Sequence, residues 1–334
     1  MKGHTMKKIF RSPIAITAAI LIIVIGVFVA VKVTGTKQNK DVVLVTHDSF
    51  VMSKSLIQEF DKTTGYNLRL LTSEDAGAMT NRLILTKADP IADAVFGIDN
   101  TLAGEAQANN LIAGPLVPTD FGDVCFNYDK YWFAAHKIAA PASINDLIKP
   151  QYKALTVVEN PATSSTGLSF LATTVDKFGT PDWQKYWSAL KANQVKVDDG
   201  WEAAYYTDFS GSSGKGPYPI VLSYGTSPAD EVRSNGQSQT ASILDGCFKQ
   251  TEYVGVLKGA RNPAGAEAVV RFLQSPDFQA TFPGTMYMYP KLASAPIPAD
   301  WLKYTRLPAK TYGDNLDFNK DRASWLHAWE AIFG

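Results

Sequence analysis

The stretch Pro217–Ala229, PYPIVLSYGTSPA, combines an apolar run with a polar, aromatic loop. Its apolar run, Ile220–Leu222, predicts a short buried strand, and the hydroxyls, aromatic ring and glycine of Ser223–Ser227 predict a loop at the end of that strand. Ser227 and Pro228 are typical of an N-cap and the first residue of a helix. Because ligands of open α/β sheets bind beyond such strand ends, the loop is a candidate binding element. A plain strand-to-helix turn is the alternative.

The chain on both sides of this stretch alternates strand and helix. Apolar runs predict strands at residues 42–46, 67–71, 92–97, 155–158, 195–197, 220–222 and 253–257. Helical periodicity falls between them, at residues 56–64, 76–88, 102–108, 167–178, 183–190, 201–209, 263–273 and 321–333. Repeated strand–helix–strand units predict an α/β fold with a mainly parallel sheet and helices on both faces. With 334 residues, 46% of them hydrophobic, the chain is long enough for two lobes.

The N-terminal 40 residues differ from the rest of the chain. Lys7, Lys8 and Arg11 precede an apolar run at Ile14–Val31, which is about the length that crosses a bilayer. This pattern predicts export, and the long run without a clear small-residue cleavage site favours an uncleaved membrane anchor over residues 1–40. We therefore expect an extracytoplasmic body anchored to the membrane. A cleaved signal, which would leave a secreted or periplasmic protein, is the alternative.

The two cysteines, Cys125 and Cys247, fit an exported protein. Disulfides persist outside the cytoplasm, and two thiols in such a chain are more often bonded than free. We therefore expect a Cys125–Cys247 disulfide.

The polar and aromatic residues that follow the predicted strands indicate the ligand. The formal net charge is zero and no basic stretch is interleaved with aromatic residues, so the sequence does not predict nucleic-acid binding. Carboxylates combined with aromatic faces are the groups that hold an organic cation. Helix capping is the alternative role for Asp48, Asp99 and Ser227. The strand-end candidates are Asp48, Asp75, Asp99, Ser164, Ser165, Trp201 and Tyr224.

Seven segments, in order, resemble the thiamine-binding proteins of bacterial ABC importers. They are HDSF (47–50), SEDAGAMTNRL (73–83), DAVFGIDN (93–100), ENPATSSTGLSFL (159–171), DDGWEAAY (198–205), VLSYGTSPA (221–229) and MYMYP (286–290). The resemblance implies a two-lobed type II periplasmic-binding-protein fold that closes over its ligand by a hinge. It implies lobe 1 at residues 41–124 with about 249–290, lobe 2 at 125–248, and a C-terminal helical segment at 291–334 packed on the lobes.

The implied function is binding rather than catalysis, without cofactor or metal. Such a protein captures thiamine, or a thiamine phosphate, and delivers it to the membrane permease and ATPase subunits of an importer. By resemblance, Asp75 supplies an acidic contact, Ser164 and Ser165 supply polar contacts near the hydroxyethyl or phosphate end, and Trp201 and Tyr224 contact the rings. Tyr287 stands where the family carries an aromatic residue.

The chain departs from the family pattern at two positions. A tryptophan that commonly follows the Asp-Ser-Phe motif is absent, because Phe50 runs into Val51, and a tyrosine after Thr-Ser-Pro-Ala is replaced by Asp230. Both changes remove a stacking face, although an added carboxylate suits a cation.

Two other functions stay open. Thiamine-degrading enzymes can share this fold and use a cleft cysteine, which would be Cys125, as the nucleophile. A receptor of the same fold could instead take ferric ion, through oxygens such as those of Tyr205, Tyr206 and Tyr224, or a polyamine or a phosphorylated sugar.

Overall fold

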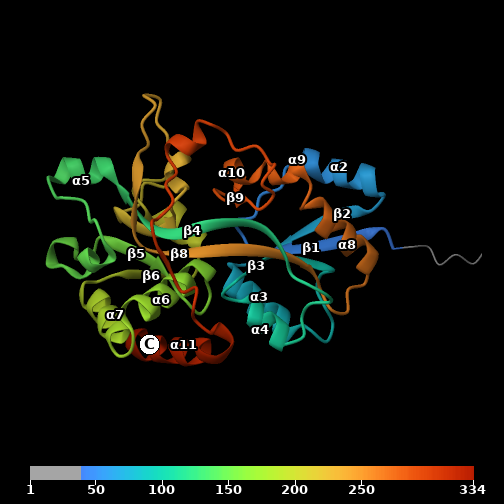
Figure 1. Cartoon of the computed structure of the whole chain (residues 1–334), viewed down its shortest axis with the longest axis horizontal. Coiled ribbons are helices and arrows are strands. Elements are labelled where there is room, and N and C mark those ends of the chain that lie inside the picture. Colours follow the sequence, from blue (N-terminus) through green and yellow to red (C-terminus); the bar gives the residue numbers. More distant parts are fainter. Residues whose placement is uncertain (1–38) are drawn as a thin grey trace, which may run out of the picture. The chain divides into compact units, whose positions relative to one another are not determined.

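The computed structural model describes residues 39–334. The predicted anchor therefore falls almost wholly outside the described residues, and it stays a prediction. Within the described part of the chain, no helix is long and apolar enough to cross a membrane. Lys40–Gly334 forms one compact unit, drawn in colour in Figure 1.

One mixed sheet of ten strands runs through this unit. Eight strands follow the order β2-β1-β3-β8-β4-β7-β5-β6, while β10 pairs with β8 and β9 pairs with β4. β1 pairs in parallel with β2 and β3, and β5 pairs in parallel with β6 and β7. Two long strands between these sets, β4 and β8, are antiparallel to each other and to their outer neighbours β7 and β3. The prediction of an α/β fold with parallel strand sets is confirmed, and the antiparallel centre is a feature that it lacked. The strands are β1 (Asp41–Thr46), β2 (Asn67–Thr72), β3 (Ala94–Asp99), β4 (Val117–Asp129), β5 (Thr156–Glu159), β6 (Lys196–Asp198), β7 (Ile220–Tyr224), β8 (Thr240–Val256), β9 (Tyr289–Pro290) and β10 (Thr311–Tyr312).

Helices cover both faces of the sheet (Figure 1). β1 shows why: Val42 and Leu44 pack in one apolar cluster with Phe60, whereas Val45 packs in the other with Met79. A strand that buries alternate residues against two helix layers has apolar side chains on both of its faces. The helices are α2 (Lys54–Thr64), α3 (Ala76–Leu85), α4 (Ala103–Ala108), α5 (Lys130–His136), α6 (Ser165–Phe178), α7 (Asp182–Ala192), α8 (Pro263–Phe272), α9 (Pro276–Gln279), α10 (Phe282–Thr285) and α11 (Phe318–Phe333).

Shorter helical turns differ from the sequence prediction. The helix expected over residues 201–209 is a π-helical turn, η3 (Ala203–Asp208). The turn after β7 is a single 3₁₀ turn, η4 (Ser227–Ala229), whose N-cap is Thr226 rather than Ser227. The Ser227 hydroxyl instead bonds the Ser223 hydroxyl and accepts from the Tyr224 N–H. The remaining 3₁₀ turns are η1 (Ile144–Ile148), η2 (Pro150–Tyr152) and η5 (Trp301–Lys303).

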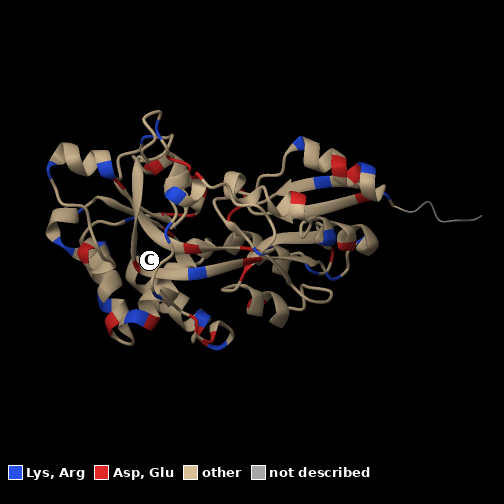
Figure 2. Ribbon diagram, turned by 45° about the horizontal axis from the view of Figure 1, so that its top comes forward, with Lys and Arg blue, Asp and Glu red and all other residues tan. Residues whose placement is uncertain are grey.

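The C-terminal segment has one long helix, α11, which buries Trp325 and Trp329. Trp329 and Phe333 both meet Trp187 of α7 edge to face, with ring centroids 5.8 Å apart. Most of residues 291–317 is irregular rather than helical. Along the outer helices, basic and acidic residues are interspersed, as α2 illustrates in Figure 2.

The Cys125–Cys247 disulfide is present, which confirms the prediction. It joins β4 to β8, the two longest strands, across a Cα–Cα distance of 4.6 Å. The lobe boundaries expected at 124/125 and 248/249 fall inside these same strands. The division into lobes therefore stays a proposal in which β4 and β8 connect the two parallel sets.

Candidate functional site

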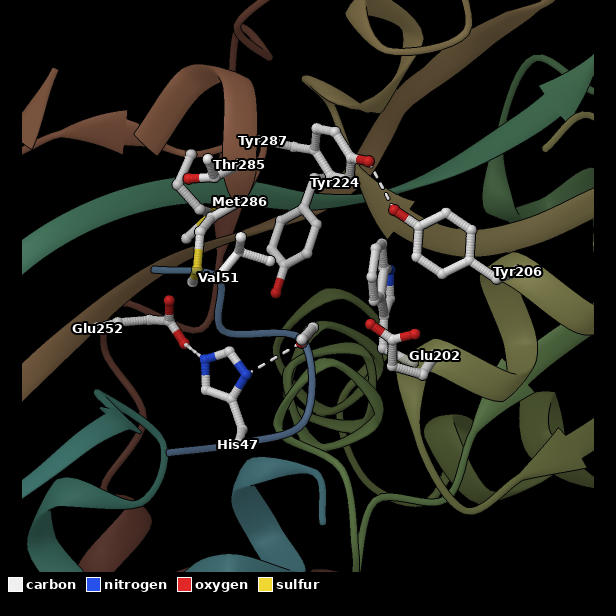
Figure 3. Close-up of a pocket in the computed structure, with 12 residues that line it drawn as sticks. His47, Val51, Glu202, Tyr206, Tyr224, Glu252, Thr285, Met286 and Tyr287 are labelled. Atoms are coloured by element: carbon white, nitrogen blue, oxygen red, sulfur yellow. Dashed lines mark hydrogen bonds and ion pairs between the residues drawn. The ribbon is translucent and has the colours of Figure 1, made fainter. Parts of the chain in front are cut away.

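A pocket lies where several strand ends meet the segment between α10 and β9 (Figure 3). Five segments far apart in sequence line this pocket. They are the residues after β1, the residues at and before η3, the end of β7, part of β8, and the segment between α10 and β9. Its volume is about 60 Å³. The lining residues are His47, Ser49, Val51, Trp201, Glu202, Tyr206, Tyr224, Glu252, Thr285, Met286, Tyr287 and Met288.

Trp201 is the centre of an aromatic cluster beside this pocket. Its ring stacks on Tyr205 at 4.9 Å and 13°, and Tyr224 and Tyr287 lie 6.2 and 6.1 Å from it. The indole N–H donates to the Ser223 hydroxyl at 2.9 Å, so the only polar atom of the ring is satisfied within the protein. The ring is 5% exposed and its orientation is fixed on several sides.

Tyr287 closes one side of the pocket and is held by its hydroxyl. That hydroxyl lies 2.5 Å from the Tyr206 hydroxyl and donates to Asp230 Oδ2 at 2.8 Å. Burial raises the pKa of Tyr206 to about 12 and also raises that of Tyr287, so both stay protonated. Asp230, which the sequence suggested as an added charge for a cation, does not line the pocket, and one of its oxygens serves this tyrosine.

His47 and Glu252 form the charged side of the pocket. His47 Nε2 lies 3.2 Å from Glu252 Oε1, and His47 Nδ1 lies 3.0 Å from the Ser49 hydroxyl. The imidazole fits against β3 because residue 97 is glycine: a Cβ there would lie 2.1 Å from His47 Cδ2. Gly97 also has a φ of +97°, which other residues rarely adopt.

Asp75 lies behind the pocket rather than in its lining. Its carboxylate does not cap α3; Oδ1 accepts from the Ser165 N–H at 3.1 Å and Oδ2 from the Trp201 N–H at 3.0 Å. Burial raises the pKa of Asp75, while these N–H donors oppose that shift. Asp75 therefore ties the start of α6 to the segment that carries Trp201. A direct contact between Asp75 and ligand stays a prediction.

The other polar candidates also lie outside the pocket lining. Ser164 caps α6, its hydroxyl accepting from the Gly167 N–H. Asp99 Oδ1 accepts from the Thr101 and Leu102 N–H groups in the turn that precedes α4. The Gln250 amide donates to both Asp99 Oδ2 and the Ser165 hydroxyl. Burial raises the pKa of Asp48, the residue after His47.

Of the predicted site residues, the structure thus brings Trp201, Tyr224 and Tyr287 together in one pocket. Sequence reasoning missed Glu252, Glu202 and His47. Glu252 stands directly before the strand predicted from residue 253, and an acidic residue inside a buried strand is the signal that could have indicated it.

Two other features bear on the alternatives. Both cysteines are in the disulfide, so Cys125 has no thiol in this form of the protein. Among residues 39–334, no three His, Cys, Asp or Glu side chains are grouped to hold a metal ion. The Tyr205 and Tyr206 hydroxyls bond Glu231 and Tyr287, respectively.

Comparison with known proteins agrees with this fold. Residues 93–311 match the family model described as bacterial extracellular solute-binding protein, and the chain belongs to that family. This membership places the folded body outside the cytoplasm.

The relatives that the chain resembles are more specific. A thiamine-binding periplasmic protein of Escherichia coli (strain K12) is 28% identical over 85% of this chain and 91% of its own length. The solved structure of a periplasmic thiamin binding protein superposes with a TM-score of 0.76 at 25% identity, covering 90% of this chain and 98% of that one. An apo ferric ion-binding protein of Pasteurella haemolytica has a TM-score of 0.68 at 15% identity over 88% and 98% of the two chains, a likeness of fold alone.

Proposed function

We propose that this protein binds thiamine, or a thiamine phosphate, in the His47–Trp201–Tyr224 pocket and delivers it to the permease and ATPase subunits of an ABC importer. The observation that carries the proposal is the pairing of an aromatic cluster with buried and half-buried carboxylates in one pocket. Aromatic faces attract a ring cation, and a carboxylate supplies its counter-charge. The relatives named as thiamine-binding proteins agree with this chemistry.

Within this proposal, Trp201, Tyr224 and Tyr287 contact the two rings of thiamine. Ser164, Ser165, Asp48 and Asp99 are then part of the polar surroundings, and Asp75 positions Trp201 through the Trp201 N–H. Tyr287 stays in place through its hydroxyl bond to Asp230, which gives the second departure from the family pattern a role in shaping the pocket wall.

Ligand entry requires movement of the pocket walls. The pocket volume of about 60 Å³ is below the roughly 300 Å³ at which small-molecule pockets begin. We infer that the two parallel strand sets separate and close about β4 and β8 during binding, as the hinge expected from the sequence would do. The apolar run at Ile14–Val31 would then hold the body at the membrane, next to the importer.

Isothermal titration of the full-length protein with a panel of ligands tests the function. We expect saturable 1:1 binding of thiamine or one of its phosphates, and no comparable binding of ferric citrate, spermidine or a sugar phosphate. Tight binding of ferric ion or spermidine without thiamine binding would favour the rival receptors. Release of a free pyrimidine from thiamine would favour the enzyme.

A further inference from the structure

Three of the four carboxylates suggested by the sequence have other partners, and the fourth, Asp48, lies outside the pocket lining. This leaves the question of what balances the ligand's positive charge. Both oxygens of Asp75 accept backbone N–H groups, Asp99 accepts from Thr101 and Gln250, and Asp230 accepts from Tyr287. None of these three lines the pocket. A cation in the pocket therefore meets other acids first.

Glu252 does line the pocket, and its side chain is 5% exposed. It projects from the middle of β8, where it pairs in register with Asp99 of β3 and Asp120 of β4. Figure 3 shows Glu252 with His47 on one side of the pocket and Glu202 on the other, with the Tyr224 hydroxyl directed between them. A buried carboxylate needs a positive partner, and His47 at 3.2 Å is that partner.

Several other ionisable groups surround the His47–Glu252 pair. Glu252 faces His47 beyond β1, Asp99 at the end of β3 and Asp120 of β4. His47 also faces Asp48, Asp75 and Glu202. Burial and the neighbouring Glu252 raise the pKa of Asp120 well above its usual range. Burial acts to lower the pKa of His47, but Glu252 and the other carboxylates outweigh burial and raise it.

We propose that Glu252 is the counter-ion for the positive charge of the ligand, and that the imidazolium of His47 takes the ligand's place when no ligand is bound. This inference rests on the proposed function, because it requires a cationic ligand. When the cation pairs with Glu252, the imidazolium of His47 loses its Nε2 proton to solvent. Neutral His47 then keeps its contact with Ser49 through Nδ1.

The test compares thiamine with 3-deazathiamine, a neutral analogue in which carbon replaces the charged thiazolium nitrogen. Titration calorimetry of the full-length protein gives the affinity of each ligand for wild type and for Glu252→Gln. We expect Glu252→Gln to weaken thiamine binding about thirty-fold or more, the usual result of removing one partner of a buried charge pair. Binding of 3-deazathiamine should change less than about threefold, because it lacks the charge.

Two further variants separate a charge role from a structural one. Asp75→Asn should weaken both ligands by the same factor, because Asp75 positions Trp201 rather than pairing with the charge. Glu267→Gln, on the exposed surface of α8, removes a carboxylate remote from the pocket and controls for net charge. A selective loss of thiamine binding in Asp75→Asn, with Glu252→Gln unaffected, would overturn the proposal in favour of Asp75.

The pH dependence tests the role of His47 independently. Since protonated His47 competes with the ligand for Glu252, wild-type affinity for thiamine should fall as the pH is lowered from about 8 to about 6, around the range in which histidine titrates. His47→Asn should remove this dependence and bind thiamine at least as well as wild type at the acidic end. Equal pH profiles for wild type and His47→Asn would contradict the proposal. Absence of wild-type binding to either ligand would instead refute the proposed function itself.

Discussion

Trp201 shows how one residue can look like core and still line a pocket. The ring is almost fully buried, stacks on Tyr205 and donates its N–H to Ser223, as a core tryptophan does. It also lines the pocket, together with Tyr224 and Tyr287. The sequence indicated Trp201 and Tyr224 because an aromatic residue at a strand end does not cap a helix, and the family resemblance indicated Tyr287.

Replacing Trp201 measures its contribution to binding. Trp201→Ala should weaken thiamine binding by about 2 kcal/mol, the value of an aromatic contact with a desolvated cation. Trp201→Phe keeps an aromatic face and should lose less. Calorimetry gives both affinities, and thermal unfolding shows whether each variant is folded. Unchanged affinity in folded Trp201→Ala would place the residue in the core alone.

Asp99 leads to a prediction about pH and stability. Burial raises its pKa to about 7, above the ordinary value of 3.8. Between these two pH values, the folded state keeps a proton on Asp99 that the unfolded state releases. The stability from this group is present below about pH 4 and is lost as the pH rises through about 7. Asp99→Asn should flatten this part of the curve of melting temperature against pH. A wild-type curve that rises steadily from pH 5 to about 7.5, and is unchanged by the substitution, would contradict this assignment.

At the scale of elements, the sequence predicted the outer strands well and the central ones poorly. β1, β3 and β7 are short apolar runs followed by turn residues, and such runs are easily read as strands. β4 and β8 contain buried Asp120, Asn127 and Gln250, which hide the apolar pattern. Because Glu252 lies in that mixed region, the sequence did not mark it as part of the site.

Gly97 of β3 affects the site because its lack of a side chain leaves space for the His47 ring. Gly97→Ala should lower the melting temperature and weaken thiamine binding, since its Cβ would lie 2.1 Å from His47 Cδ2. Gly65→Ala is the matched control: Gly65 also has a positive φ, of 76°, but a Cβ there would have nothing within 4 Å. The control should lose only about 1 kcal/mol of stability and keep its affinity. Equal losses in both variants would mean that the His47 contact contributes nothing.

At the scale of the whole molecule, the disulfide restricts the conformations that the unfolded chain can adopt. Cys125 and Cys247 are 122 residues apart, so opening the bridge should cost about 5 kcal/mol of unfolding free energy in the chain-entropy description. Urea unfolding of the Cys125→Ser, Cys247→Ser double variant measures this cost. Wild type treated with reductant is the control and should unfold at the same urea concentration as the double variant. A double variant as stable as oxidised wild type would contradict the prediction.

A crystal structure of the protein with thiamine tests the central claim most directly. We expect ligand density between Trp201, Tyr224 and Tyr287. The thiazolium ring should lie beside Glu252, and His47 should be displaced from its ion pair with Glu252. It also predicts a larger pocket than the present one of about 60 Å³. Thiamine bound at another surface, with the His47–Glu252 pair intact and the Trp201 pocket unchanged, would contradict the account.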